Sequence, residues 1–369
     1  MAAERILVTG GASGIGWAIC RALASAGHAV AVADIDPQVH DRARKLGPQH
    51  VALQTDLTEA GEAGTLPVRA AEALGGLDVI VNNAGMTDSS GRTLVDLPDD
   101  AFDRIVALNL TAVQQICAAA PGVLTKGGRI VNLASGASFR PLALRGPYSA
   151  TKAGIVALTQ RLAQDFAPQG IAVSAVAPGY TLTPLVQALA DQGRVDLDKV
   201  AAAIPLGRLA QPEDIADAVV FAASAEGRVL AGQTVLVDGG GSAGPAHGST
   251  MTAPGSPRPV VVPVPTGPAS YTLRHIRQVA QSLADDTVAL LFVFDAPQDA
   301  EQATAVAAGQ MLARTLALEW APSGRRVNAL TWHGIPGPDR DALCAFLTGP
   351  RAGYITAQAI TAGPLTGAD

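Results

Sequence analysis

A tyrosine and a lysine four residues apart, Tyr148 and Lys152, open a predicted helix near the middle of the chain. At this spacing both side chains project from one face of a helix. A free phenol has a pKa of about 10, too high for a base at neutral pH, but a neighbouring ammonium favours the phenolate. Ser135, at the end of a predicted strand, could bind the same substrate oxygen. The three side chains could therefore exchange a proton with a hydroxyl or carbonyl group.

A glycine-rich turn near the N-terminus supplies a second element of this chemistry. Residues Thr9–Gly16 read Thr-Gly-Gly-Ala-Ser-Gly-Ile-Gly and lie between a predicted strand and a predicted helix. Glycines let such a turn approach a dinucleotide pyrophosphate, and the helix N-terminus stabilises its charge. Asp34 closes the next predicted strand, where a carboxylate can bind adenosine ribose hydroxyls. The alternative is that Asp34 only caps the following turn.

The residues around Asp34 favour NAD over NADP. Its carboxylate would repel a 2′-phosphate, and neither Ser13 nor Ile35 supplies a basic group to hold one. A bound nicotinamide cation would also favour the phenolate of Tyr148. The sequence therefore predicts hydride transfer to or from a carbonyl carbon.

These residues need a scaffold, and the apolar pattern of the first 240 residues predicts one. Seven short apolar runs alternate with helical patterns, which indicates right-handed βαβ crossovers and an α/β, Rossmann-like, doubly wound parallel sheet. The predicted strands are Arg5–Val8, Ala29–Ala33, His50–Gln54, Leu77–Asn82, Gly128–Ala134, Ile171–Ala177 and Thr234–Val237. The glycine turn follows the first strand, and Ser135 follows the fifth.

Three further motifs complete the pattern: Asn82-Asn-Ala-Gly85, Asn109 within Leu-Asn-Leu, and Pro178-Gly179 followed by Thr183. With these motifs in this order, residues 4–241 resemble the short-chain dehydrogenase/reductase family. The resemblance implies a catalytic set acting on one substrate oxygen. Its members are Tyr148 as general acid/base, Lys152 as pKa modulator and ribose ligand, Ser135 as substrate-oxygen partner, and Asn109 as support for a proton-relay water.

The resemblance also implies a set of cofactor-binding residues in the loops that follow the strands. They are Gly10, Ser13, Gly14, Ile15, Gly16, Asp34, Asp56, Leu57, Asn83, Ala84, Gly85, Tyr148, Lys152, Pro178, Gly179, Thr181 and Thr183. Asp56 and Leu57 match positions that contact adenine, and Thr183 matches the position near the nicotinamide carboxamide. Ala134 departs from the pattern, because the family often has a serine there, but no effect on catalysis is expected.

Substrate recognition is less defined by the sequence. Arg140 and Arg145 lie between Ser135 and Tyr148, so all four residues are candidate substrate ligands. The arginines could attract a carboxylate, sulfonate or phosphate, although loop arginines are more often solvated or paired at an interface. Residues 193–199 are expected to belong to a mobile lid. The leading hypothesis is an NAD-dependent enzyme that interconverts a secondary alcohol and a ketone, and the alternative is a non-catalytic cofactor-binding scaffold or sensor.

A second unit is predicted after a linker at residues 242–259, which is rich in glycine, serine and proline. The predicted division is therefore 1–241, 242–259 and 260–369. Two sequence correspondences link the last segment to the first: Ala167–Val173 resembles Ala321–Val327 at an offset of 154, and Phe221 and Gln233 match Phe346 and Gln358 at an offset of 125. The last segment is predicted to be a shortened Rossmann-like half-copy with roughly the last four strands.

The predicted half-copy has lost the site. Tyr148 corresponds to Gln302 and Lys152 to Val306, and no serine occurs between Thr287 and Ala303. The elements that remain, a pair of long helices and the final strand, resemble those that the family uses for subunit contacts. We expect it to dock on the first unit in place of a neighbouring subunit. A separate module that binds a partner or effector is the alternative.

Composition excludes several classes of partner. A net charge of −6 without a basic stripe argues against nucleic acid. Three separated cysteines indicate reduced core thiols, and six scattered histidines predict no metal. Met1–Arg5 leads directly into the first strand, so no signal peptide is expected, and no apolar run is expected to reach the ~20 residues that span a bilayer. We expect a cytoplasmic homo-oligomer, with a dimer favoured.

Overall fold

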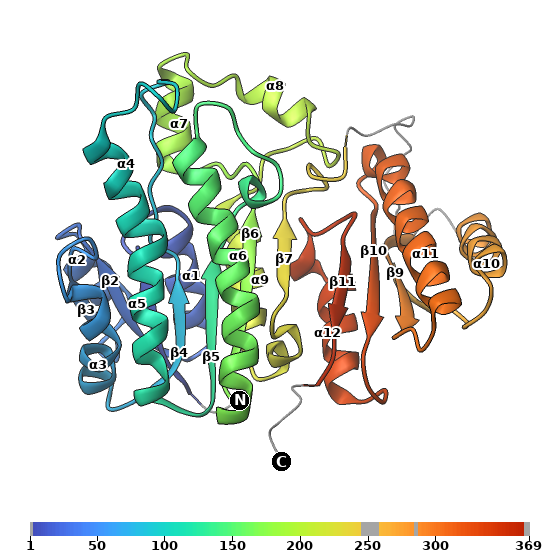
Figure 1. The fold of residues 1–369 in the computed structure, drawn as a ribbon, viewed down its shortest axis with the longest axis horizontal. Helices are drawn as coiled ribbons and strands as arrows, with labels where there is room; N and C mark the ends of the chain where they lie inside the picture. Colours follow the sequence, from blue (N-terminus) through green and yellow to red (C-terminus); the bar gives the residue numbers. More distant parts are fainter. Residues whose placement is uncertain (1–2, 245–257, 284–286, 365–369) are drawn as a thin grey trace.

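The computed structural model describes residues 3–244, 258–283 and 287–364, which form two parallel sheets flanked by helices (Figure 1). Residues 3–244 are called the first unit below, and residues 258–364 the second unit. Most of the predicted linker, residues 245–257, lies outside the described residues.

The first sheet confirms the predicted seven-stranded, doubly wound fold. Its strand order is β3-β2-β1-β4-β5-β6-β7, with every neighbouring pair parallel. The strands are β1 Arg5–Thr9, β2 Ala29–Asp34, β3 Val51–Gln54, β4 Leu77–Asn82, β5 Leu124–Leu133, β6 Ala172–Pro178 and β7 Thr234–Val237. The order reverses between β1 and β4, and ligands of doubly wound sheets bind at such a switch point, beyond the carboxyl ends of the strands.

The predicted fifth strand is four residues short at its start. The structure begins β5 at Leu124, and its pairing with β4 shifts register between Leu77 and Val79. The added residues include the exposed Thr125 and Lys126. Strand propensity in a sequence reflects half-buried apolar positions, so an exposed polar extension carries little signal.

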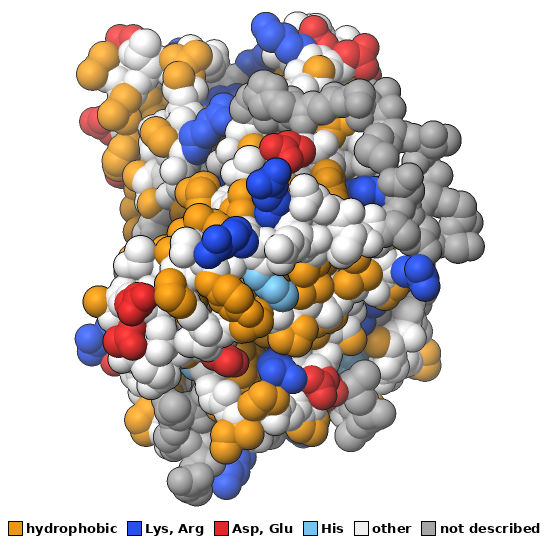
Figure 2. Space-filling model, turned by 90° about the vertical axis from the view of Figure 1, so that its right-hand side faces the viewer, with side chains coloured by type: hydrophobic (Ala, Val, Ile, Leu, Met, Phe, Trp, Pro, Cys, Tyr) orange, Lys and Arg blue, Asp and Glu red, His pale blue; other side chains and the backbone are white. Residues whose placement is uncertain are grey.

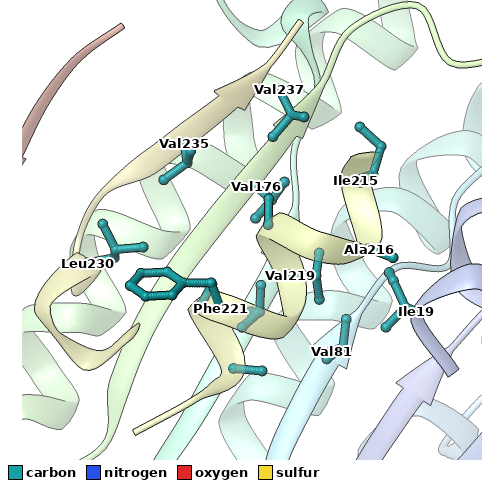
Figure 3. Packing of buried hydrophobic residues seen from close by; sticks show 14 of the residues in the cluster. Ile19, Val81, Val176, Ile215, Ala216, Val219, Phe221, Leu230, Val235 and Val237 are labelled. Atoms are coloured by element: carbon teal, nitrogen blue, oxygen red, sulfur yellow. The ribbon is translucent and has the colours of Figure 1, made fainter. Parts of the chain in front are cut away.

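Helices cover both faces of the first sheet. They are α1 Gly14–Ser25, α2 Val39–Leu46, α3 Glu62–Leu74, α4 Asp99–Val106, α5 Ala112–Ala119, α6 Gly146–Phe166, α7 Pro184–Asp191, α8 Leu197–Ala202 and α9 Pro212–Ala223. Alternate residues of each strand face opposite layers, so Ile6 and Val8 join a core with α1 and α9, whereas Leu7 joins a core with α3, α5 and α6. Figure 3 shows Ile215 and Val219 of α9 packed beside Val81 and Val176.

The second sheet has four parallel strands in the order β11-β10-β9-β8. Its elements are β8 Arg258–Pro263, α10 Ala269–Ser282, β9 Thr287–Asp295, α11 Ala300–Trp320, β10 Arg326–Trp332, α12 Pro338–Thr348 and β11 Ala359–Ala362. The predicted smaller α/β unit is therefore present. Its α12 joins the same hydrophobic cluster as α1 and α9, so the two units share a core.

A groove of about 600 Å³ lies between α10 and α11 in the second unit. Apolar side chains line much of it, among them Leu273, Ile276, Leu312, Leu316 and Trp320. Figure 2 shows the face to the right of Figure 1, where hydrophobic side chains gather between basic ones. None of the predicted site residues lines this groove, so it is separate from the chemistry considered below.

Among the described residues, one continuous helical stretch of 24 residues, Asp99–Gly122, is long and apolar enough to cross a membrane by length and composition, because an 18-residue window within it has a mean hydropathy of 1.3. The stretch is not one uninterrupted apolar run, because Asp99, Asp100, Asp103 and Arg104 lie in its first six residues. Its apolar residues Val113, Ile116 and Cys117 are buried in the core with α3 and α6. A core helix of a globular protein passes the same compositional test.

Candidate active site

The turn after β1 can be built only with glycine. Gly10 and Gly14 have φ values of 65° and 51°, which disfavour other residues. A Cβ atom on Gly16 would lie 1.9 Å from the carbonyl oxygen of Gly10. The Asn83 side chain braces the turn, because its Nδ2 donates to the carbonyls of Thr9 and Gly10 at 2.9 and 3.1 Å. Asn83, predicted to lie beside a cofactor, therefore shapes the turn itself.

The N-terminus of α1 is open to an anion. Ser13 occupies the N-cap position but makes no side-chain capping bond, and the first turn of α1 contains no acidic residue. Ile15 lies in that first turn, and a Cβ on Gly14 would be 3.6 Å from a methyl group of Thr183. Backbone N–H groups and the positive helix end meet here. These residues fit a dinucleotide pyrophosphate.

Asp34 binds backbone groups on both of its sides. Its carboxylate accepts from the N–H of Ala12 at 2.9 Å and from the N–H of Asp36 at 3.0 Å. Asp34 therefore orders the turn that follows β2, as the alternative interpretation expected, and it also contacts the glycine turn; ribose binding stays a prediction. This places a negative charge where an adenosine ribose would meet the glycine turn.

A basic residue beside this turn was missed by the sequence analysis. Arg42, in α2, donates from Nε to the carbonyl of Ala12 at 2.9 Å, and its guanidinium lies 4.8 Å from the centre of the Trp17 ring. Arg42 is eight residues beyond Asp34, so only the packing of α2 against the turn brings it near. It could offset the repulsion that Asp34 exerts on a 2′-phosphate.

The predicted adenine-contacting pair follows β3. Asp56 accepts from the N–H and the hydroxyl of Thr58, at 2.9 and 2.7 Å, and these hydrogen bonds hold the pKa of its carboxyl below the usual value. Leu57 is only 9% exposed and packs in the core. The side chain of Asp56 is thus the more accessible of the two.

Gly85, Asn109 and Lys152 meet at one point. A Cβ on Gly85 would lie 3.3 Å from Oδ1 of Asn109 and 3.4 Å from Nζ of Lys152. Asn109 lies in a π-helical turn, Ala107–Thr111, and exchanges two 2.8 Å hydrogen bonds with the backbone of Met86. π-Helical turns often occur at functional sites. Asn109 therefore holds the loop after β4, which includes Ala84 and Gly85, against Lys152.

Lys152 is a buried cation. Its side chain is in α6, its Nζ donates to the carbonyl of Leu133 at 2.7 Å, and it lies 5.9 Å from the centre of the Tyr148 ring. Burial lowers the pKa of this ammonium to about 8. The position of Lys152 one helical turn from Tyr148, as predicted, brings its charge to the phenol.

Tyr148 differs from the expectation in one respect. Burial raises the pKa of its phenol above 10, and a hydrogen bond with Ser135 only partly opposes this effect. Within the protein alone, the loss of hydration of the phenolate is therefore the dominant influence on this pKa. The predicted fall in pKa therefore needs a further positive charge, which an oxidised nicotinamide would supply.

Ser135 is held rigidly beside Tyr148. It is the N-cap of a short 3₁₀ turn, Gly136–Ser138, and its Oγ accepts from the N–H of Ala137 at 3.1 Å. The hydroxyl of Ser138 in turn accepts from the N–H of Ser135 at 3.3 Å. A fixed hydroxyl next to the phenol can orient a substrate oxygen.

The loop after β6 approaches the glycine turn from the other side. Pro178 ends β6, the N–H of Gly179 donates to Val237, and Thr181 pairs with Ala210 in an isolated bridge. Thr183 caps α7, its hydroxyl accepting from the N–H of Val186 at 3.3 Å. The predicted lid, residues 193–199, includes Arg194, which donates to the carbonyl of Ser89. This segment therefore bridges to the loop after β4.

The two candidate substrate arginines differ. Arg140 is exposed, whereas the guanidinium of Arg145 donates to the carbonyl of Asp88. Large apolar side chains are also exposed on the segments that border Ser135, Tyr148 and Thr183, which the sequence analysis did not anticipate. They are Leu94, Val95, Phe139, Leu144 and Leu185. An apolar rim with one free arginine fits a substrate that has both an apolar body and an acidic group.

The buried ammonium makes a stability prediction. Because the folded pKa of Lys152 is about 8 and its usual value is 10.5, the unfolded chain binds more protons between these pH values. Stability therefore rises with pH in this window. Relative to Lys152→Met, the wild type should gain about 3 kcal/mol in free energy of unfolding between pH 8 and 10.5.

Urea unfolding at several pH values measures this difference, and the exposed Lys199→Met serves as the matched control. The control should show no such pH dependence. A constant difference between wild type and Lys152→Met over the window would show that Lys152 is not a buried cation.

Comparison with known proteins places this site in a family. A sequence model described as enoyl-(acyl carrier protein) reductase matches residues 10–242. An uncharacterized short-chain type dehydrogenase/reductase of Sinorhizobium fredii is 35% identical over 256 residues, which cover 68% of this chain and 46% of that protein. The chain belongs to the short-chain dehydrogenase/reductase family. Within this family, the first unit corresponds to the matched region.

Two further members of the short-chain dehydrogenase/reductase family resemble the chain. The cis-4-hydroxycyclohexanecarboxylate dehydrogenase of Sinomonas cyclohexanicum is 40% identical over 245 residues, 64% of this chain and 96% of that protein. A solved structure from Beutenbergia cavernae, provisionally assigned as an NAD(P)-dependent gluconate 5-dehydrogenase with NADP bound at low occupancy, is 32% identical with a TM-score of 0.60. It covers 66% of this chain and is itself covered to 98%. The chain is therefore a family oxidoreductase with a nicotinamide cofactor.

The described residues contain no group of three histidine, cysteine, aspartate or glutamate side chains that could hold a metal ion. The three cysteines are free and buried, and burial raises the pKa of each thiol. They are therefore core residues rather than nucleophiles.

Proposed function

We propose that the chain is an NAD-dependent dehydrogenase that interconverts a secondary alcohol and a ketone, with Tyr148 as general acid/base. The observation that carries this proposal is the meeting of Lys152, Asn109 and Gly85 at one point, with the centre of the Tyr148 ring 5.9 Å from Nζ of Lys152. A bound nicotinamide supplies the hydride acceptor or donor in this reaction.

The proposed mechanism assigns one task to each side chain. Ser135 holds the substrate oxygen, and Tyr148 removes the hydroxyl proton during oxidation or returns it during reduction. The Lys152 ammonium stabilises the phenolate, and Asn109 fixes the loop after β4 through Met86. Because the ammonium is buried, its charge is only weakly screened.

We propose NAD rather than NADP because Asp34 places a carboxylate beside the glycine turn. Arg42 is the feature that favours NADP, and the Beutenbergia cavernae neighbour holds NADP. The balance between these two charges is therefore expected to set the preference.

Asp34→Asn tests this balance. Removing one charge about 4 Å from a phosphate is worth roughly 1 to 4 kcal/mol, so the ratio of kcat/KM for NAD over NADP should fall by at least about fivefold. Adding Arg42→Gln should restore part of the preference for NAD. Steady-state kinetics with both cofactors measures the ratio, and an unchanged ratio in Asp34→Asn would contradict the assignment.

For the substrate we propose a hydroxylated compound with an apolar ring or chain and a carboxylate. The apolar rim and the exposed Arg140 support this class, as does the 40% identity to a cis-4-hydroxycyclohexanecarboxylate dehydrogenase. The NAD preference favours oxidation as the working direction. Arg145, which binds the carbonyl of Asp88, is assigned to loop positioning or to a second substrate contact.

The test is a screen for NAD reduction by the purified full chain. Cyclic and linear hydroxycarboxylates, polyols, sugar acids and hydroxyacyl thioesters are compared, with Tyr148→Phe as the control. Turnover that depends on Tyr148 supports an enzyme. NAD binding with no turnover for any class would favour the cofactor-binding scaffold.

The remaining assignments are proposals of the same kind. We divide the chain into a catalytic domain at 1–241, a linker at 242–259 and a non-catalytic half-domain at 260–369. We propose a cytoplasmic location, with which buried reduced thiols are compatible. We also propose a homo-oligomer, with a dimer favoured, in which the second unit covers the α9 face of its own chain.

A further inference from the structure

The second unit repeats the C-terminal part of the first unit, from α6 to β7. The helices α6 and α11 have 21 residues each, and the strands β6 and β10 have seven, all at an offset of 154. Both helices end in a 3₁₀ turn and a left-handed glycine, Gly170 with φ 70° and Gly324 with φ 74°. The strands β7 and β11 have four residues each, at an offset of 125.

The irregular backbone bonds repeat with the same offsets. In the first unit, Gly232 N–H donates to Val173 at 2.8 Å and Ala175 N–H donates to Gln233 at 2.9 Å. In the second unit, the corresponding bonds, Ala357 to Val327 and Ala329 to Gln358, both measure 2.8 Å. Loop contacts of this kind are specific to one backbone path. The correspondence therefore supports the predicted half-copy.

Equivalent residues meet where the two units touch. The rings of Phe221 and Phe346, which correspond at the offset of 125, stack at 4.1 Å between centroids with an interplanar angle of 6°. A residue can face its own equivalent only near a two-fold axis. The contact between the units thus has the geometry of a symmetric dimer.

The flanking contacts are reciprocal. Helix α12 packs against the 3₁₀ turn Glu226–Leu230, and α9 packs against the equivalent turn, Pro350–Ala352. Two hydrogen bonds are related in nearly the same way. Gly239 N–H donates to Tyr354 at 3.1 Å, and Gly363 N–H donates to Val229 at 3.3 Å. Val229 is the equivalent of Tyr354, whereas Gly363 is the equivalent of Asp238, one residue before Gly239. Such reciprocity is the signature of an isologous interface.

The charges at this contact distinguish the second unit from a second copy of the first. Arg351 lies 3.4 Å from Asp217 of α9, and it occupies the position that corresponds to Glu226. In a symmetric pair of first units, Asp217 of each copy would therefore face Glu226 of the other copy, which gives two repulsive contacts. When the second unit occupies this face instead, Arg351 stands in the place of Glu226, so Asp217 meets a positive charge rather than a negative one.

We infer that the face formed by α9 and β7 is a dimer-type surface that this chain fills with its own second unit. Full-length chains therefore do not pair through this face. Arg351 makes the internal partner preferable to a second copy, so any assembly of whole chains uses another surface.

The test uses four full-length proteins and light scattering after size-exclusion chromatography. They are the wild type, Glu226→Arg, the pair Glu226→Arg with Phe346→Glu, and the same pair with Phe221→Glu added. Phe346→Glu should release the second unit, and Glu226→Arg should remove the repulsion at the freed face. We expect the pair to have twice the wild-type mass, and the other two variants to keep the wild-type mass.

Each other result counts against the inference. A wild-type mass for the pair would show that the freed face does not bind a second copy. A doubled mass for the triple variant would show association through surfaces other than Phe221, and a doubled mass for Glu226→Arg alone would show an unoccupied face. Phe346→Ser in place of Phe346→Glu gives a milder series, with circular dichroism as the check on folding.

Discussion

Replacing Tyr148 by phenylalanine is expected to lower kcat by about 10²- to 10⁴-fold, the usual contribution of a positioned general acid/base. The substitution removes only the hydroxyl that shares a hydrogen bond with Ser135. The glycine turn, the α1 N-terminus and the Lys152 contact with Leu133 do not involve this hydroxyl. NADH binding, followed by fluorescence, should therefore change little.

The matched control is Tyr271→Phe, a half-exposed tyrosine on α10 of the second unit. It should keep wild-type turnover, because α10 supplies none of the site residues. If Tyr148→Phe retained more than a tenth of the wild-type kcat, the general acid/base assignment would be wrong. A loss of NADH affinity equal to the loss of kcat would instead place Tyr148 in cofactor binding alone.

Replacing Tyr354 by alanine is expected to reduce the free energy of unfolding of the second unit by about 3 to 5 kcal/mol, as for other large aromatic truncations in a core. Tyr354 is 1% exposed and lies between the units. Its hydroxyl donates to the carbonyl of Arg208 at 2.7 Å, and the Arg208 guanidinium lies 4.5 Å from the ring centre. Alanine leaves a cavity and an unpaired carbonyl.

Two of the three tryptophans, Trp320 and Trp332, lie in the second unit, so a Trp17→Phe background makes fluorescence report on that unit alone. Denaturant unfolding in this background measures the change. Tyr354→Phe is the control, and it should cost about 1 to 3 kcal/mol, because only the hydrogen bond to Arg208 is lost. A cost below about 1 kcal/mol for Tyr354→Ala would mean that the two units do not pack together in solution.

The parts of the fold that sequence patterns predicted are those governed by local rules. The seven strands alternate between two apolar layers, and their periodicity is visible wherever both faces are buried. The glycine turn was equally visible, because Gly16 and Gly10 approach too closely for any side chain. The start of β5 was missed because its first residues are exposed and polar.

Site residues were predicted by position, but their surroundings were not. Asn109 and Lys152 were named from motifs, and the structure brings both beside Gly85. The raised pKa of Tyr148 follows from burial, which depends on segments far away in the chain. Arg42 escaped prediction for the same reason, since no local pattern links α2 to the backbone of Ala12.

By itself, the sequence determined the sheet, the glycine turn and the existence of a second unit, and it predicted a catalytic set that lies in the first unit alone. These depend on side-chain periodicity and backbone sterics within a few residues. The tertiary structure alone decided how the two units meet, with Phe221 stacked on its equivalent Phe346 and Arg351 beside Asp217. Such contacts join residues more than a hundred positions apart, and only the packing of whole layers against one another determines which of them meet.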